Sequence, residues 1–461
     1  MNAPSQVDLV IRGGVVLTAE PGFQPFEADV AVSNGRIAAV GPNLPVVAAR
    51  VVEGRGDVVM PGLVNAHMHE TMERGLFADL PFMEWLNDFA LPKDMAYEPR
   101  HMRASALLNQ LEMIRGGTTS FIDIFRHPSE AASVAETSGL RATFAPQLID
   151  TPAGSGETLD SSIGFIETWR GRVPDRIRTW FGPHALYSCE EATYRRVREL
   201  ADGLGVGIHT HLAETEAEVG IVAGRSGGLT PTAWLDRLLG LGPDVLAAHC
   251  VQLTAADMAL LAERDVAVAH CPSSNMKLGN GAAPIPSLRE AGVRVGLGTD
   301  SNMTNNDLDM FEEMRLASFL QKLARRDAAA LPARQVLEMA TIGSARALGL
   351  GDDVGSIEVG KKADLIVVSL GGPHTWPAFR EAPGNVIEHV VFACHASDVR
   401  TTIVDGRILM EDGVVRSIEQ AEVEDLVDRE SRDLLRKAGV LERLIGGAGG
   451  NRGTGRAGGA G

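Results

Sequence analysis

The chain has 461 residues, of which 44% are hydrophobic and 5% aromatic, so it can form two or three domains or one large α/β barrel with an attached domain. Its formal net charge of −17, with no visible basic stripe, argues against nucleic acid and anionic membranes as partners. No uncharged apolar run approaches membrane-spanning length.

The cysteines and the N-terminus favour a cytoplasmic protein. The first eight residues lack the basic-then-apolar layout of a signal peptide. The four cysteines show no paired spacing, which indicates reduced thiols. They are Cys189, Cys250, Cys271 and Cys394.

Both ends of the chain have the sequence pattern of a small β domain. In residues 1–58, short β-prone runs alternate with Gly and Asn-Gly turns, and residues 355–420 show the same pattern. Because two β-rich ends flank a different middle, we expect one composite β-sandwich domain built from both of them. Two separate β caps are the alternative.

Residues 59–354 alternate between strand-like and helix-like segments. Eight apolar, β-prone runs are each accompanied by a helix-like stretch, such as 101–115 or 310–326. Eight such units over this length predict a TIM-like (β/α)8 barrel. The expected strands are 58–67, 118–123, 141–145, 178–182, 207–211, 245–249, 266–270 and 293–300.

The C-terminal end contains two further segments. Residues 421–445 are charged and helix-prone, which predicts a C-terminal helix. Residues 446–461 are Gly-rich and cannot form a core, so we expect a disordered tail. A binding tail is the alternative.

Histidines and aspartates are concentrated at the expected strand ends. Barrels of this kind place their catalytic groups at the C-terminal ends of the strands. The residues at or just beyond these ends are His67, His69, Asp123, His184, His209, His211, His249, His270 and Asp300. This concentration at one rim is the strongest functional signal in the sequence.

Four of these residues form a candidate metal site. His67 and His69 are two positions apart on one strand, so both imidazoles point to the same side. With His211 and Asp300 they make a mixed nitrogen and oxygen site for one divalent metal, for which we expect Zn²⁺, with Fe²⁺ or Mn²⁺ as alternatives. A second metal would need a bridging group, often a carbamylated lysine. No lysine occurs between Lys93 and Lys277, so we expect a mononuclear site.

Three residues can transfer protons at this site. Glu214 lies three positions beyond His211 and can shuttle a proton without binding the metal. His249 can contact the attacking water or the oxyanion, and Asp300 can accept a proton from the water. His209 shares a strand face with His211 but lies one layer deeper, so we expect it to support the site or to belong to the barrel core.

The motifs resemble the amidohydrolase superfamily, in the branch of the S-adenosylhomocysteine/methylthioadenosine deaminases and the triazine hydrolases. The resemblance extends from the N-terminal strands to about residue 416 and includes PGLVNAHMH (61–69), HTHLAETEAEV (209–219), SSNMKLGNGAAPI (273–285) and LGTDS (297–301). It implies the ligands and catalytic residues proposed above. It also implies a homodimer or homotetramer.

Within this branch the chain is most similar to the adenosine-type deaminases. The resemblance implies that His184 contacts the purine, Trp85 lines the pocket and Asp94 binds ribose hydroxyls. We also expect Asn275 and Ser301 to contact the substrate. Two arginines that would hold a homocysteine carboxylate are missing, because residues 144–147 and 156–159 contain none.

These observations predict a hydrolase that removes an exocyclic amine as ammonia from a nitrogen heterocycle, such as an adenosine-type purine or a triazine. The alternative is hydrolysis of an amide, urea, carbamate or aryl-chloride bond in a xenobiotic by the same site. A third reading is a non-catalytic ligand-binding or scaffold protein. The complete ligand set, together with Glu214, argues against it.

Overall fold

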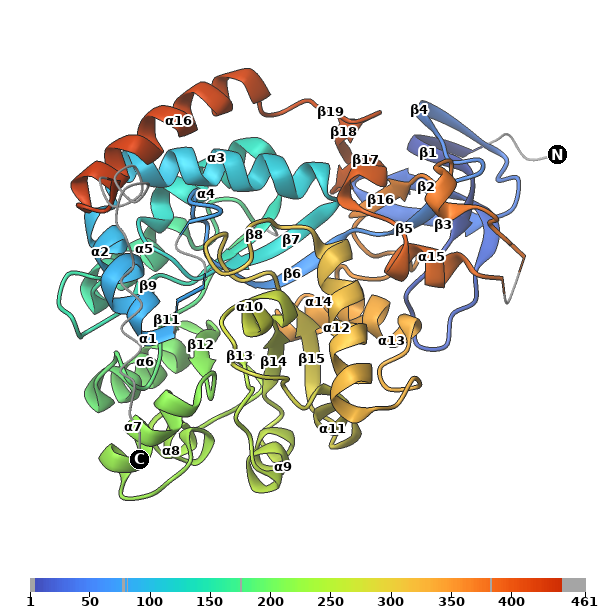
Figure 1. Ribbon diagram of the computed structural model, residues 1–461. Helices are drawn as coiled ribbons and strands as arrows, with labels where there is room; N and C mark the ends of the chain where they lie inside the picture. The colour runs from blue at the N-terminus through green and yellow to red at the C-terminus, as the bar shows by residue number, and fades with distance from the viewer. Residues whose placement is uncertain (1–4, 77–78, 81, 175, 382–383, 442–461) are drawn as a thin grey trace, which may run out of the picture.

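The computed structural model describes residues 5–76, 79–80, 82–174, 176–381 and 384–441. The Gly-rich segment 446–461 and residues 442–445 of the expected C-terminal helix lie outside the described residues. The rest of that helix forms α16 (Gln420–Lys437), which lies along α3 (Pro99–Arg115) (Figure 1).

One nine-stranded sheet contains strands from both ends of the chain. Its strands are β1 (Ser5–Val16), β2 (Phe26–Ser33), β3 (Arg36–Gly41), β4 (Val46–Glu53), β5 (Val58–Pro61), β16 (Leu365–Val368), β17 (Val399–Val404), β18 (Arg407–Glu411) and β19 (Val414–Val415). The two ends of the chain meet where β16 pairs antiparallel with β5. The N-terminal and C-terminal β segments therefore share one hydrogen-bonded sheet.

The middle of the chain forms two parallel four-stranded sheets and one parallel pair. The first sheet contains β6 (Leu63–Met68), β7 (Thr118–Asp123), β8 (Arg141–Phe144) and β10 (Ile177–Thr179). The second contains β12 (Ile208–Leu212), β13 (Val245–His249), β14 (Ala267–His270) and β15 (Arg294–Leu297), and the pair is β9 (Gln147–Leu148) with β11 (Gly182–Pro183). All eight segments expected to be strands contain a strand of these sheets.

Backbone contacts connect the two parallel sheets at both of their edges. A parallel bridge joins Phe181, just after β10, to Ile208 at the start of β12. At the other edge the amide of Asp300, beyond β15, donates to the carbonyl oxygen of His67 on β6 at 2.9 Å. The same contact brings two predicted metal ligands together.

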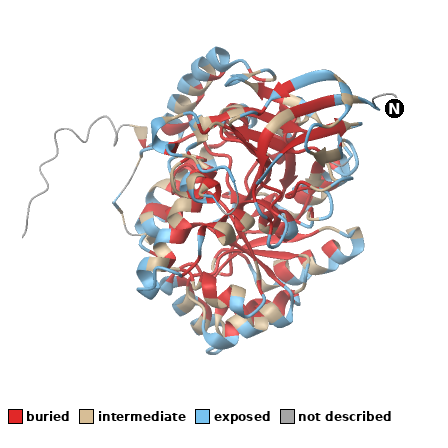
Figure 2. Ribbon diagram, turned by 90° about the vertical axis from the view of Figure 1, so that its right-hand side faces the viewer, coloured by how far each residue is buried: buried red, intermediate tan, exposed pale blue. Residues whose placement is uncertain are grey.

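Helices follow most of the parallel strands. They are α1 (Phe82–Trp85), α2 (Leu91–Ala96), α4 (Pro128–Ser138), α5 (Leu159–Trp169), α6 (Glu191–Leu204), α7 (Glu216–Ser226), α8 (Pro231–Leu239), α9 (Ala255–Glu263), α10 (Pro272–Lys277), α11 (Ile285–Glu290), α12 (Met310–Arg325), α13 (Ala333–Glu338), α14 (Ser344–Ala347) and α15 (Val386–Phe392). Several start at a side-chain cap; for example, Thr215 accepts from the amide of Glu218, and Asp309 from that of Phe311. Figure 2 shows buried central strands and helices exposed on their outer sides. Within the described residues no helix is both long and apolar enough to span a membrane.

The expectation of one strand over residues 58–67 is wrong, because the chain changes sheets at Gly62. The amide of Gly62 donates to Asp364 in the nine-stranded sheet region, whereas that of Leu63 donates to Gly117, just before β7. A Cβ atom at position 62 would lie 2.1 Å from Oγ1 of Thr119, so only glycine fits this crossing. The strand that carries His67 therefore begins at residue 63.

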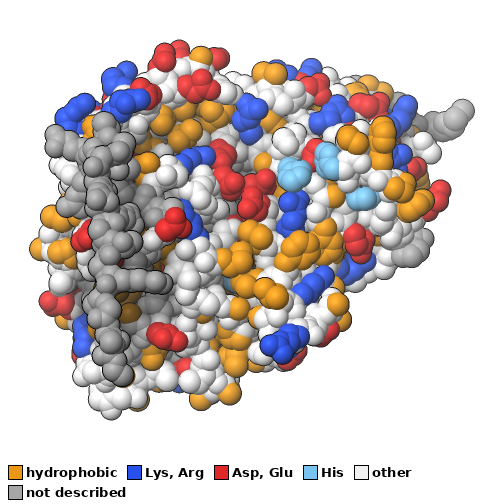
Figure 3. Space-filling model, viewed as in Figure 1, with side chains coloured by type: hydrophobic (Ala, Val, Ile, Leu, Met, Phe, Trp, Pro, Cys, Tyr) orange, Lys and Arg blue, Asp and Glu red, His pale blue; other side chains and the backbone are white. Residues whose placement is uncertain are grey.

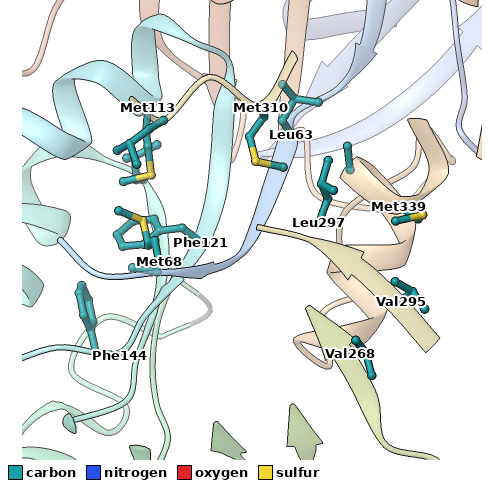
Figure 4. Close-up of a cluster of buried hydrophobic side chains, with 14 of the residues drawn as sticks. Leu63, Met68, Met113, Phe121, Phe144, Val268, Val295, Leu297, Met310 and Met339 are labelled. Carbon is teal, nitrogen blue, oxygen red and sulfur yellow. The ribbon is translucent and has the colours of Figure 1, made fainter. Parts of the chain in front are cut away.

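Apolar side chains from the strands and the helices behind them form the main core. Figure 4 shows Met68 of β6 beside Phe121 and below Met113, and Leu63 at the other end of the strand beside Met310, all buried. The rings of Phe121 and Phe144 meet edge to face with centroids 5.8 Å apart. This packing fixes β6, which delivers the first two histidines.

Candidate metal and active site

The predicted site residues meet at the C-terminal ends of β6, β12, β13 and β15. His67 is the last residue but one of β6, His211 lies on β12, His249 ends β13 and Asp300 follows β15, and all four are buried. His249 and Asp300 have φ angles of 71° and 62°. Non-glycine residues in this left-handed region carry backbone strain, which is concentrated at functional sites.

The side chains of His69 and His211 face each other through bare nitrogens. Their Nε2 atoms lie 3.2 Å apart. Nδ1 of His69 is 2.5 Å from the carbonyl oxygen of Ile124, and Nδ1 of His211 is 2.8 Å from that of His184. Carbonyl oxygens only accept, so each Nδ1 carries the proton, and burial lowers the pKa of both imidazoles. Two lone pairs therefore point at one spot.

A chain of two hydrogen bonds fixes the orientation of His67. Nδ1 of His209 lies 2.9 Å from the carbonyl oxygen of Leu246, so it must donate. Nε2 of His209 therefore accepts from Nδ1 of His67, at 2.8 Å. Burial lowers the pKa of His67 to about 4, and its buried Nε2 has no hydrogen-bond partner. A third lone pair is thus presented to the site.

Asp300 connects the histidines of the metal site with His249. Its Oδ1 lies 3.5 Å from Nε2 of His69 and 3.6 Å from Nε2 of His67. Its Oδ2 lies 3.8 Å from Nε2 of His249 and accepts from the hydroxyl of Ser274 at 2.6 Å. Burial acts to raise the pKa of Asp300, but the imidazoles around it, above all that of His67, outweigh burial and lower the pKa, so the carboxylate is anionic.

This donor set fits a divalent metal ion. Two groups of side chains have all their donor atoms within 4.8 Å of one another: His67, His69 and Asp300, and His67, His211 and His249. Neutral imidazole nitrogens with one carboxylate oxygen are the ligands that zinc prefers. The unpartnered Nε2 of His67 supports the fit, because buried polar atoms in folded proteins are otherwise paired.

Glu214 faces the same space and is held at two points. Nδ2 of Asn280 donates to Oε1 of Glu214 at 2.9 Å. The carboxylate of Glu218 accepts from the backbone amides of Ala213 and Glu214 at 3.0 and 2.8 Å. Burial raises the pKa of Glu214. A carboxyl group that keeps its proton more strongly than usual is suited to proton transfer.

His249 lies between the two carboxylates of the site. Its Nε2 is 3.9 Å from Oε2 of Glu214 and 3.8 Å from Oδ2 of Asp300, and its Nδ1 is 3.0 Å from Oδ1 of Asn275. The amide oxygen of Asn275 only accepts, so Nδ1 of His249 donates to it. Burial acts to lower the pKa of His249, but the two carboxylates outweigh it and raise the pKa.

A cavity opens above these groups and brings together most of the predicted substrate-binding residues. The residues that line it include His69, His211, Glu214, His249 and Asp300 together with Trp85, Asp94, His184 and Ser301. Asn275 is not among the lining residues; it lies behind His249, to which it is hydrogen bonded. One wall is the helical segment 82–96, made of α1, a short π-helical turn (Leu86–Ala90) and α2.

Four further residues at this site were not singled out from the sequence. Lys93 lines the cavity beside Asp94, and Ser274, Asn280 and Glu218 hold the reactive side chains. Ser274 and Asn280 belong to the SSNMKLGNG stretch, and Glu218 follows Glu214 by one helical turn, so the motifs contained them without revealing their partners.

With the geometry established, the chain can be compared with known proteins. The sequence profile of the Amidohydrolase family matches residues 58–409. The 5'-deoxyadenosine deaminase of Methanosarcina acetivorans is 40% identical over 436 residues, which cover 94% of this chain and 99% of that protein. The 5-methylthioadenosine/S-adenosylhomocysteine deaminase of Moorella thermoacetica is 42% identical over 400 residues, which cover 86% and 92%.

A solved structure agrees with these matches. The crystal structure of an adenosine deaminase from Xanthomonas campestris with bound zinc superposes with a TM-score of 0.89 at 37% sequence identity. The alignment covers 94% of this chain and 100% of that one. The similarity therefore includes the β segments at both ends as well as the parallel sheets.

Proposed function

The chain belongs to the amidohydrolase family and is a hydrolase of C–N bonds, and on this premise we propose that it releases ammonia from adenosine nucleosides with an uncharged 5′ end. The observation that carries the proposal is the convergence of His67, His69, His211 and Asp300 below a cavity that Glu214 also faces. The curated relatives that match nearly the whole chain are named as deaminases of 5'-deoxyadenosine and of 5-methylthioadenosine and S-adenosylhomocysteine. Hydrolysis of a xenobiotic amide, urea or chloride is therefore not favoured.

We propose that His67, His69, His211 and Asp300 hold one zinc ion. The Xanthomonas structure contains zinc, and Fe²⁺ or Mn²⁺ would suit the same ligands. When bound, the metal acts as a Lewis acid that lowers the pKa of a water molecule toward neutrality. His249 belongs to one of the two convergent groups, but we assign it to proton transfer because its Nε2 also faces two carboxylates.

The protein side chains then carry the protons. Oδ2 of Asp300 and Nε2 of His249 orient the attacking water and accept its proton as the oxygen adds to the ring carbon that bears the amine. Glu214, whose pKa burial raises, donates a proton to the adjacent ring nitrogen. When the C–N bond breaks, the proton taken from water leaves with the amine as ammonia. The added hydroxyl gives its remaining proton back to Glu214 as its oxygen becomes the ring carbonyl, so one water is consumed for each ammonia released.

The cavity walls support a purine nucleoside without a charged 5′ group. We propose that His184 contacts the purine, Trp85 packs against it, and Asp94 and Ser301 contact its polar groups. Much of the remaining wall is apolar, and includes Phe82, Leu86, Ala90, Leu278 and Met303. No arginine is among the described residues that line the cavity, so a carboxylate at the 5′ end would lack a bidentate partner.

We further infer the architecture that holds this site. The backbone contacts at both edges of the two parallel sheets support closure into a (β/α)8 barrel of residues 59–354. The single sheet shared by both ends supports the composite β-sandwich of residues 1–58 and 355–420. On the face shown in Figure 3, basic and acidic side chains are interspersed and form no continuous basic stripe, which supports a small-molecule substrate rather than a nucleic acid. A homodimer or homotetramer in the cytoplasm remains our prediction.

The decisive experiment measures metal content and ammonia release on one purified sample. We expect one zinc per chain, and ammonia from adenosine, 5′-deoxyadenosine and 5′-methylthioadenosine. S-adenosylhomocysteine should be the poorest of the nucleosides, because its amino-acid end carries charge. Ammonia from a triazine amine but from no nucleoside would overturn the proposal.

A further inference from the structure

We propose that Lys93 is a positioning residue that sets specificity for the ribose diol: it holds one oxygen of Asp94 and leaves the other for the 2′- and 3′-hydroxyls. This inference rests on the proposed nucleoside function. It concerns a residue that takes no part in the chemistry at the metal site, and its role can be measured separately from that chemistry.

Lys93 is an unusual residue because its ammonium group is buried. The residue is 3% exposed, yet it lines the cavity. Its Nζ lies 2.8 Å from Oδ1 of Asp94 and 3.5 Å from Oε2 of Glu73. A lysine is almost never buried to this extent without charged partners. Here the two carboxylates supply them.

Aromatic rings and a hydroxyl complete the surroundings of Lys93. Nζ lies 5.3 Å from the ring centroid of Tyr97 and 5.4 Å from that of Phe125, within the range of cation–π attraction. The hydroxyl of Tyr97 donates to the carboxylate of Glu73, with its oxygens at 3.1 and 3.3 Å. Burial acts to lower the pKa of Lys93, but the two carboxylates outweigh it and raise the pKa, so the ammonium stays charged.

These contacts restrict Asp94 on both its backbone and its side chain. The guanidinium of Arg126 donates to the carbonyl oxygen of Asp94, which fixes the end of α2 at the cavity. Oδ1 of Asp94 pairs with the ammonium of Lys93 at 2.8 Å, whereas no described residue forms an ion pair or hydrogen bond with Oδ2, and Asp94 lines the cavity. A carboxylate oxygen has two lone pairs, so it can accept from two neighbouring hydroxyls at once. A 2′,3′-diol presents that pair of donors.

The charges explain why this arrangement selects a nucleoside. Glu73 and Asp94 carry two negative charges, and Lys93 neutralises one of them. The remaining negative charge favours hydroxyl donors and repels a phosphate or carboxylate on the substrate. Nζ of Lys93 contacts both carboxylates, so its loss would leave them facing each other without a cation and let Asp94 move away from Glu73.

The test is the substitution Lys93→Met, which keeps an unbranched side chain of similar volume and removes its charge. Ammonia release is measured with adenosine and with 2′,3′-dideoxyadenosine, which differ only in the diol. We expect the KM for adenosine to rise about 10-fold or more while kcat changes little, and the KM for the dideoxy substrate to stay unchanged. The ratio of kcat/KM for adenosine to that for 2′,3′-dideoxyadenosine should therefore be smaller in the variant than in the native enzyme.

Lys277→Met is the matched control. Lys277 lies beside the cavity but bonds to the carbonyl oxygen of Met303 and to Asn306, not to Asp94. It should leave the diol preference unchanged. The double variant Lys93→Met/Glu73→Gln removes both buried charges. If the single variant folds poorly, the double variant tests whether the diol preference is lost without Lys93. Zinc content reports on whether the site is intact in each protein.

The outcomes separate the two proposals. If the unmodified enzyme releases no ammonia from any adenosine nucleoside, the proposed function is wrong. If it does, but Lys93→Met and the double variant keep the full diol preference, the function stands and the role of Lys93 is refuted. A native enzyme that shows no preference for the diol would also refute it.

Discussion

Nε2 of His209 lies 2.8 Å from Nδ1 of His67, so a histidine outside the proposed ligand set decides which nitrogen of His67 is free. The carbonyl oxygen of Leu246 forces the proton of His209 onto Nδ1. His67 must then donate from its own Nδ1 and present a bare Nε2 to the proposed metal site. One backbone carbonyl thus determines the tautomers of two buried rings.

We predict that His209→Gln weakens metal binding about 10- to 100-fold, the usual cost of losing a hydrogen-bond partner behind a metal ligand. Zinc affinity is measured by competition with a chromophoric chelator. His270→Gln is the control, because His270 is an equally buried histidine that ends β14, two strands away from the strand of His209, and has no hydrogen bond to a proposed ligand. Equal zinc affinity in the His209 variant and the native protein would contradict the prediction.

The convergence of the four proposed ligands could be predicted from the sequence because it depends on local geometry. The two-residue spacing of His67 and His69 on a strand, and the position of His211 and Asp300 at later strand ends, follow from the alternation of side chains and the barrel rule. The depth of His209 follows from the same alternation. The exact end of each strand had little effect on this prediction, since all these residues converge at the same edge of the parallel sheets.

Contacts between distant segments could not be predicted in this way. The pairing of Lys93 with Glu73 joins α2 to the loop after β6, and neither segment has a periodic pattern that reveals the other. Arg141 and Asp364 are 223 positions apart. The break at Gly62 was also missed, because a continuous apolar run gives no sign that its two halves pair with different sheets.

We predict that His249→Gln lowers kcat by about 10²–10⁴-fold, the usual contribution of an acid–base group, while zinc content stays near the native value. The glutamine can still donate to Asn275 but cannot take up a proton. The two readouts are the rate of ammonia release and the zinc content of the same sample. Loss of zinc together with activity would show that His249 is a metal ligand instead.

Arg141 joins β8 to the nine-stranded sheet, and we predict that Arg141→Met strongly destabilises the fold. Its guanidinium contacts Asp364 at 2.8 Å and Asp405 at 2.7 Å and is almost fully buried. Removing it leaves Asp364 buried without its cation, at a cost of about 3–5 kcal/mol. Thermal melting should show the loss, and activity well below the melting temperature should be retained.

Arg172→Met is the control for that experiment. Arg172 pairs with Glu136 at 3.0 Å on the surface, where both side chains are more than a third exposed. Such a pair contributes about 0–1 kcal/mol. If the two variants melt at the same temperature, Arg141 does not hold the β segments to the parallel sheets.

Glu313 makes the stability of the protein depend on pH. This buried residue of α12 accepts from Asn305 at 2.8 Å and from the amide of Ser273 at 3.3 Å, and burial raises its pKa from 4.5 to about 8. Between these pH values the native state holds a proton that the unfolded chain has released. The contribution of Glu313 to the free energy of unfolding is therefore fully present below pH 4.5. It is lost as the pH rises to 8, at up to about 1.4 kcal/mol per pH unit.

Glu313→Gln removes this titration, so we predict that the fall in melting temperature between pH 5 and pH 8 becomes smaller by about 2–4 °C. The glutamine resembles the protonated acid, so the two proteins should differ little at pH 5 and the variant should be the more stable at pH 8. Glu312→Gln is the matched control, because Glu312 is the exposed neighbour on the same helix and undergoes the same change in formal charge. If both variants keep the pH dependence of the native protein, Glu313 is ionised in the fold, and the burial of its carboxyl group does not raise its pKa.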